Sequence, residues 1–115
     1  MSGIVTQGNL PHTSAEITFN YSYPPMPPSE GNKALLAKLS SVSEDLGFGS
    51  VTAYDPGKRG AADVSFVAAH LPVIDGLGAE GLGAHTTEES IDLSLLPQLT
   101  QRAALLIYRL GQSTR

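Results

Sequence analysis

The apolar and polar residues near the start of the chain alternate. In residues 14–20, Ala15, Ile17 and Phe19 are separated by polar neighbours, and this period of two predicts a half-buried strand. Four prolines follow within residues 24–28. Proline fixes φ and lacks a backbone N–H, so we expect a stiff, extended segment. It is either a connector between two structural units or a rigid edge that crosses one unit.

Helical spacing of apolar residues appears in three later segments. A helix is predicted over residues 30–46, between the N-cap Ser29 and Gly47. Small residues predict a short helix over 61–69, and Ser94 is expected to cap a last helix that runs to residue 110. That last helix is apolar over much of its circumference, which indicates that the chain packs against something else.

Short apolar runs complete the pattern. Residues 51–54 and 72–76 are both predicted to be strands, the second leading into a glycine-rich loop. The order of elements is strand, linker, helix, strand, helix, strand, loop and helix. This order predicts an α/β fold.

Composition narrows the classes of partner. The chain has 115 residues, about one domain, and a net charge of -4. Its seven Lys and Arg residues are scattered, which argues against nucleic acid as a partner, and no apolar run approaches the ~20 residues that span a bilayer. With no cysteine, any metal site must use histidine and carboxylates. The N-terminus has no secretory pattern, so we expect a cytoplasmic protein.

The glycine-rich run of residues 76–89 is the first candidate site. Four glycines precede His85, and Glu88 and Glu89 follow it. Glycine lets a backbone approach a ligand closely. Residues 76–81 also read as GxGxxG, but no helix pattern opens within the motif, which disfavours dinucleotide binding. On these residues alone, His85 is either a solvent-facing loop residue or one metal ligand of an incomplete set.

A second candidate site lies at residues 55–63. Lys58 and Arg59 precede the predicted short helix, whose first turn contains Asp63. Arg59 is suited to a bidentate contact with a carboxylate. A basic surface turn that Asp63 caps is an equal alternative.

Taken in order, three segments resemble the C-terminal portion of the M20 family of zinc peptidases and amidohydrolases, which includes glutamate carboxypeptidases, dipeptidases and aminoacylases. Lys58–Asp63 is similar to the family's Arg/Gly-Gly-Gly-Ser/Thr-Asp turn, although Ala61 and Ala62 replace its glycine and hydroxyl residues. Residues 81–89 are similar to its glycine-rich His-x-x-x-Glu loop. Residues 91–110 are similar to its closing segment.

The resemblance implies roles for individual residues. His85 would be the last ligand of a two-zinc site, and Gly83 would let the backbone approach the metals and the substrate. Arg59, Gly60 and Asp63 would line the end of the pocket that holds the substrate carboxylate. Glu89 would hold the metal ligand in position without binding a metal itself. The substrate would be a peptide or an N-acyl amino acid.

The resemblance also implies a division of the chain. Residues 1–23 would contain the terminal strand of a lid or dimerisation domain, residues 24–29 the connector, and residues 30–115 the C-terminal part of a catalytic domain with helices on a small mixed sheet. The family's other ligands, a His-x-Asp pair, a bridging Asp and a Glu-Glu pair, belong to an N-terminal catalytic half that this chain lacks. We therefore expect an inactive fragment, with a homodimer possible. The alternative is a noncatalytic, self-associating interaction module.

Overall fold

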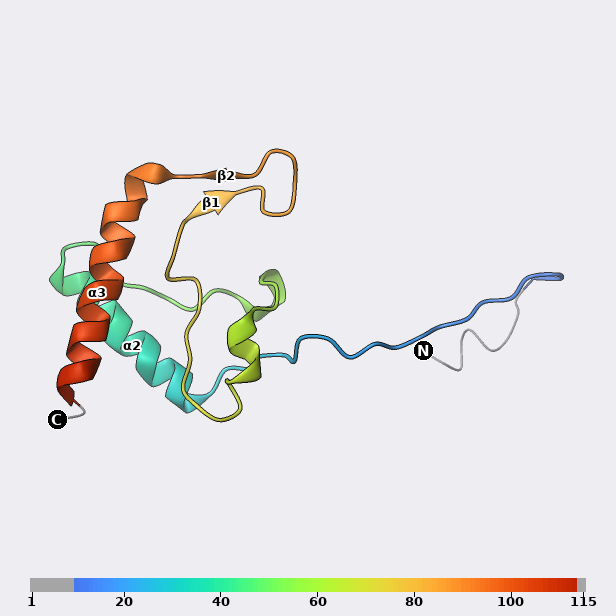
Figure 1. Cartoon of the computed structure of the whole chain (residues 1–115), viewed down its shortest axis with the longest axis horizontal. Coiled ribbons are helices and arrows are strands. Elements are labelled where there is room, and N and C mark those ends of the chain that lie inside the picture. Colours follow the sequence, from blue (N-terminus) through green and yellow to red (C-terminus); the bar gives the residue numbers. More distant parts are fainter. Residues whose placement is uncertain (1–9, 114–115) are drawn as a thin grey trace.

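The structure, a computed structural model, describes residues 10–113 and contains two long helices and one small hairpin (Figure 1). The long helices are α2 (Glu30–Asp45) and α3 (Leu96–Ser113), and the hairpin pairs β1 (Gly81–Leu82) with β2 (Ser90–Ile91). Three short 3-10 helices are η1 (Pro56–Lys58), η2 (Asp63–Phe66) and η3 (Leu93–Leu95). This mixture of helices and a two-stranded sheet is compatible with the predicted α/β class.

Helix α2 confirms the prediction for residues 30–46. The Ser29 hydroxyl accepts a hydrogen bond from the Asn32 amide at 3.1 Å, as an N-cap does. Beyond Asp45, the amides of Leu46 and Gly47 bond to carbonyls of the last turn, and Gly47 has a φ of 80°. Glycine adopts that conformation without steric cost, so it ends the helix where the sequence indicated.

Helix α3 is confirmed, but its predicted cap is wrong. The helix begins at Leu96, after η3, and Ser94 is not its N-cap. Instead, the Asp92 carboxylate accepts hydrogen bonds from the Ser94 amide at 2.9 Å and the Ser94 hydroxyl at 2.6 Å. An aspartate two residues upstream thus binds one free amide of the first turn, and the helical path starts earlier, in η3.

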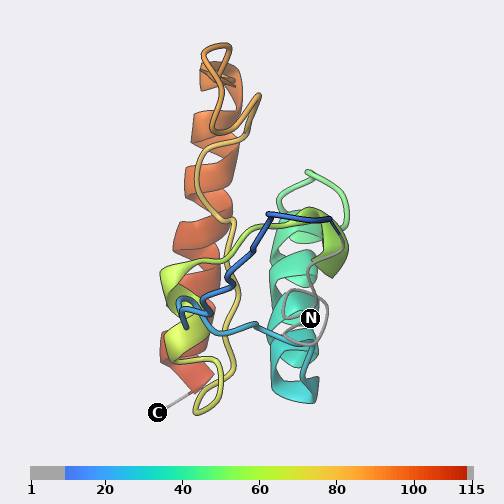
Figure 2. The same ribbon diagram turned by 90° about the vertical axis from the view of Figure 1, so that its right-hand side faces the viewer.

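The core lies where α2 packs against α3 (Figure 2). Its buried residues are Leu39, Val42 and Leu106, and half-buried side chains from four segments surround them: Leu36, Leu46, Val51, Ile74, Leu77, Leu105 and Leu110. An exposed ion pair between Arg109 and Asp45, at 2.7 Å, also joins the two helices. This helix pair anchors the loops that carry the candidate site.

The strands predicted at residues 51–54 and 72–76 do not form. Both segments lie along α2, where side chains supply their hydrogen bonds: the Val51 amide donates to the Ser40 hydroxyl at 3.0 Å, and the Val73 amide to the Asn32 side chain at 2.8 Å. A strand needs a neighbouring backbone, and β1 and β2 pair only with each other among residues 10–113. The expected mixed sheet is therefore replaced by one antiparallel hairpin.

The predicted helix over residues 61–69 is much shorter. Only Asp63–Phe66 is helical, as the 3-10 helix η2, and irregular turns follow. The position before it is Ala62, which offers no side-chain cap. The Ser65 amide bonds to the Ala62 carbonyl, but no side chain caps the segment to favour a longer helix.

The N-terminal segment leaves the body of the molecule as an extended chain (Figure 1). Residues 14–20 do not pair with a strand in the described part of the chain, so the predicted strand is not formed here. Assignment of residues 1–23 to a lid or dimerisation domain stays a prediction, and residues 1–9 lie outside the described residues.

The molecule is an elongated slab rather than a sphere. Its radius of gyration is 20.2 Å and its extents are 66 × 36 × 18 Å, whereas a compact chain of this length would have a radius of gyration of about 13 Å. None of the helices within residues 10–113 combines the length and apolar character needed to cross a bilayer.

Candidate functional site

The hairpin presents the glycine-rich loop at its tip. Gly81 pairs with Ile91 and Leu82 with Ser90, and the Asp92 amide donates to the Glu80 carbonyl at 2.8 Å. A side chain at Gly81 would overlap the Ser90 carbonyl. The close approach of the two strands therefore requires glycine at this position.

The loop between the strands is a hydrogen-bonded turn around Thr86. Its hydroxyl and its amide both donate to the Gly83 carbonyl, at 2.7 and 3.0 Å, and its hydroxyl accepts from the Glu88 amide at 3.2 Å. Gly83 has a φ of 69°, and a β-carbon there would lie 3.0 Å from the Glu88 carbonyl oxygen. The turn itself therefore favours glycine at position 83, and the predicted role of Gly83 beside the metals and the substrate stays a prediction.

His85 occupies the turn in a left-handed conformation, with a φ of 65°. Such a backbone costs a residue with a β-carbon roughly 1–2 kcal/mol. The histidine is exposed. Departures of this kind from favoured geometry are common where a side chain has to be directed toward a ligand.

A groove of about 860 Å³ brings several of the predicted residues together. Arg59 and Gly60 line it together with His85, which lies far from them in sequence. The proline-rich segment forms another wall, and Asp75 and Gly76 line it too. The structure therefore places the two candidate sites of the sequence, residues 55–63 and 76–89, on the same groove.

The cation and the carboxylate of the second candidate site, residues 55–63, both contact the proline-rich segment or the tyrosine that precedes it. The Arg59 guanidinium donates to the Met26 carbonyl at 3.0 Å, and the Tyr23 hydroxyl donates to Asp63 at 3.0 Å. The Tyr23 ring also lies 5.1 Å from the Phe66 ring, centroid to centroid, in a tilted arrangement. Hydrogen bonding to Asp63, followed by the carboxylate's charge, raises the pKa of the Tyr23 hydroxyl.

Three predicted residues lie off the groove. Asp63 does not line it, and is joined to its wall through Tyr23. Gly83 belongs to the turn that contains His85, where its carbonyl accepts the Thr86 amide. Glu89 is exposed and directly precedes β2. The backbone amide of Glu89 donates to the Thr86 carbonyl at 3.3 Å, which makes it part of the turn that carries His85.

Asp75, Tyr23 and Met26 also belong to this region, although no motif in the sequence marks them. Asp75 directly precedes the glycine run, so its place after an apolar segment was a usable signal. Tyr23 and Asp63 are 40 residues apart, and Met26 contributes a backbone carbonyl. Such long-range backbone and side-chain contacts leave no periodic pattern in a sequence.

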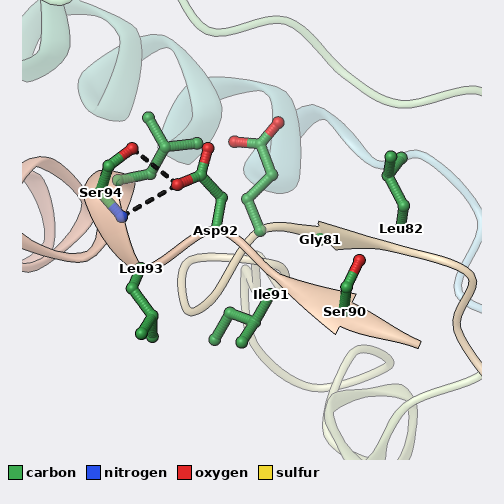
Figure 3. A pocket seen from close by; sticks show the side chains of 9 residues that line it. Gly81, Leu82, Ser90, Ile91, Asp92, Leu93 and Ser94 are labelled. Atoms are coloured by element: carbon green, nitrogen blue, oxygen red, sulfur yellow. Dashed lines mark hydrogen bonds between the residues drawn. The ribbon is translucent and has the colours of Figure 1, made fainter. Parts of the chain in front are cut away.

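A second cavity, of about 650 Å³, lies beside the hairpin (Figure 3). Its wall runs from β1 to the start of α3, and the labelled side chains include Leu82, Ile91 and Asp92. The hydrogen bonds from the hydroxyl and the amide of Ser94 lower the pKa of Asp92. Neither Arg59 nor His85 lines this cavity, whose wall comes from the hairpin and η3.

The donors present do not by themselves fit a metal ion. Within residues 10–113, no three histidine or acidic side chains come close enough together to hold one. His85 and Asp75 share the groove, but a stable zinc site needs three or four protein donors.

Along the chain, Arg59 comes first and is followed by the glycine-rich hairpin, which carries His85 on its strained turn. The motifs of the M20 family that the sequence resembles occur in this order. The sequence profile described as Peptidase family M20/M25/M40 matches residues 2–109. The chain belongs to this family. No curated protein and no solved structure gave a significant match.

Membership places this M20/M25/M40 chain among peptidase-type hydrolases, which are generally metal-dependent. The match extends through the proline-rich segment, the turn at Arg59 and the His85 loop. The groove thus lies within the part of the chain that defines the family.

Proposed function

We propose that this chain supplies the C-terminal part of the active site of an M20-type metallohydrolase. His85 would provide one metal ligand, and Arg59 would bind the carboxylate end of a peptide or an N-acyl amino acid. The observation that supports this most is that His85, Arg59 and Gly60 line one groove. The remaining ligands would come from an N-terminal catalytic half, and the expected metal is zinc.

The positive charge and the remaining hydrogen-bond donors of Arg59 support its proposed role in binding the substrate carboxylate. Its guanidinium has five N–H donors, and the Met26 carbonyl engages one nitrogen. The remaining donors suit a carboxylate, which arginine binds in a bidentate manner. Gly60, next to it, leaves the backbone open at the groove wall, with no atom within 4 Å of where a β-carbon would lie. A carboxylate held there and a metal at His85 would bracket the bond to be cleaved.

The test is to express the chain alone and together with a polypeptide that carries the His-x-Asp and Glu-Glu segments, taken from the neighbouring coding sequence. Hydrolysis of dipeptides and N-acyl amino acids is measured with and without chelator. We expect no activity from the chain alone, and chelator-sensitive activity from the pair that is lost in His85→Asn. Chelator-sensitive hydrolysis by the chain alone, lost in the same variant, would overturn the fragment assignment.

A noncatalytic, self-associating module is the alternative, and exposed apolar side chains favour it. Leu82, Ile91 and Leu93 on the hairpin side, and Ile107 and Tyr108 on α3, are all exposed. Exposed apolar surface of this kind commonly marks an association surface. Size-exclusion chromatography combined with zinc titration separates the two functions. Oligomers that form regardless of zinc, and equally in His85→Asn, would favour the module.

A further inference from the structure

The proline-rich segment is fastened to the groove wall at two points. We call residues 23–28 the strap, and residues 59–66 the wall turn. At one point the Tyr23 hydroxyl donates to Asp63 at 3.0 Å while its ring packs on Phe66. At the other, the Met26 carbonyl accepts from the Arg59 guanidinium at 3.0 Å. The two contacts lie three residues apart on the strap and four apart on the wall turn.

The strap is stiff, so the contact at one end determines where the other end lies. Four of its six residues are proline, and each proline locks one backbone dihedral. Its far end runs directly into the Ser29 cap of α2. Met26 is therefore held on both sides, by Tyr23 before it and by the helix cap after it. A side chain that binds the Met26 carbonyl is held with it.

We propose that Tyr23 is a positioning residue: by fastening the strap to Asp63 and Phe66, it holds the Met26 carbonyl where it fixes the Arg59 guanidinium at the groove. Arg59 is an exposed side chain, and a free arginine at such a place samples many rotamers. A fixed guanidinium presents its remaining donors in one orientation. This inference concerns the chain's own residues and stands independently of the reaction proposed above.

The test follows the arginine side chains by NMR in the free chain, which has only four arginines. The Nη–Hη signals of a guanidinium that donates a hydrogen bond become distinct from the averaged signals of free arginine. Arg59→Lys assigns the Arg59 signals. We expect Tyr23→Phe, which removes the hydroxyl and keeps the ring, to collapse them to the averaged position.

Three comparisons make the result specific. Tyr21→Phe removes a hydroxyl from a fully exposed ring two residues away and should leave the Arg59 signals distinct. Asp63→Asn keeps an acceptor for the Tyr23 hydroxyl and should also preserve them, whereas Asp63→Ala should not. Arg109, paired with Asp45, should be unchanged in every variant.

The outcomes that overturn the proposal are equally specific. Distinct Arg59 signals in both Tyr23→Phe and Asp63→Ala would show that the strap does not depend on Tyr23. Averaged Arg59 signals in the unsubstituted chain would show that the Met26 contact does not hold the guanidinium. Loss of the Arg109 signals together with those of Arg59 would show a general loss of structure, and would contradict a local role for Tyr23.

Discussion

Gly81 and Ser90 approach each other across the hairpin so closely that a β-carbon on residue 81 would overlap the Ser90 carbonyl. The obstacle is backbone, which cannot rotate away as a flexible side chain does. The hairpin, and the position of His85 at its tip, therefore depend on the absence of one methyl group.

Gly81→Ala is expected to open the hairpin. Overpacking of this kind typically costs about 1–3 kcal/mol, which a pair of two-residue strands cannot absorb. Hydrogen exchange of the Asp92 amide, which is bonded to the Glu80 carbonyl, should become faster in this variant. Gly78→Ala is the matched control because a β-carbon there meets nothing within 4 Å. Equal exchange in the two variants would contradict the predicted clash.

The conformation of His85 determines which substitution best tests its side chain. With a φ of 65°, alanine at this position would add backbone strain, whereas asparagine adopts the left-handed region more readily than most residues. We expect His85→Asn to leave the hairpin's amide exchange unchanged and His85→Ala to increase it. Thermal and exchange measurements on the two variants check this, and a more perturbed Asn variant would refute it.

The Tyr23–Asp63 contact should be visible as a pH effect. The pKa of the Tyr23 hydroxyl is raised, so folding favours its neutral form. The contact therefore stabilises the fold fully below pH 10.0, and this stabilisation is lost as the pH rises through the raised pKa. Absorbance titration of tyrosinate in the unsubstituted chain and in Tyr23→Phe isolates this group by difference. In Asp63→Ala it should ionise at lower pH; an unchanged midpoint would disprove the coupling.

Stability should depend on the helix pair. Leu106 is buried between α2 and α3, whereas the next residue, Ile107, is largely exposed. Leu106→Ala is expected to lower the free energy of unfolding by about 2–5 kcal/mol, and Ile107→Ala by no more than about 0.5 kcal/mol. Denaturant unfolding followed by circular dichroism measures both. Similar losses in the two variants would mean that the core lies elsewhere.

The start of α3 should weaken in acid. Hydrogen bonds from Ser94 lower the pKa of Asp92, so the charged carboxylate is favoured when folded. The carboxylate therefore stabilises the fold fully above pH 3.8, its ordinary pKa, and this stabilisation is lost as the pH falls through the lowered pKa. Asp92→Ala should therefore increase amide exchange at Ser94 at neutral pH, and the difference from the unsubstituted chain should shrink in strong acid. A pH-independent difference would contradict this origin.

The elements that the sequence predicted well are those with local signals. Helix α2 is bounded by Ser29 and Gly47, and both act through backbone groups within one turn. The prediction of strands over residues 51–54 and 72–76 was wrong. A strand must pair with the backbone of a neighbouring strand, and an apolar sequence does not show whether such a neighbour is present. The hairpin was missed for the opposite reason, since each of its strands has only two residues, too few to show a period.

The candidate site divides in the same way. The motifs around Arg59 and His85 could be recognised in the sequence, because they consist of glycine and charged residues in a given order along the chain. Their meeting in one groove was not visible, because it depends on how the chain folds back along α2. The contacts that Tyr23 makes belong to the same class, since they join residues 40 positions apart.

The slab is only 18 Å thick, less than two helix diameters of about 10–12 Å. In so thin a body few side chains are fully enclosed: Leu39, Val42 and Leu106 are buried, but large apolar side chains elsewhere on the body face water. Any surface that covers the slab therefore adds a term of RT ln(1 + [L]/Kd) to the free energy of unfolding. The melting temperature of this chain should thus report the concentration of whatever binds it, which makes stability itself an assay for the natural partner.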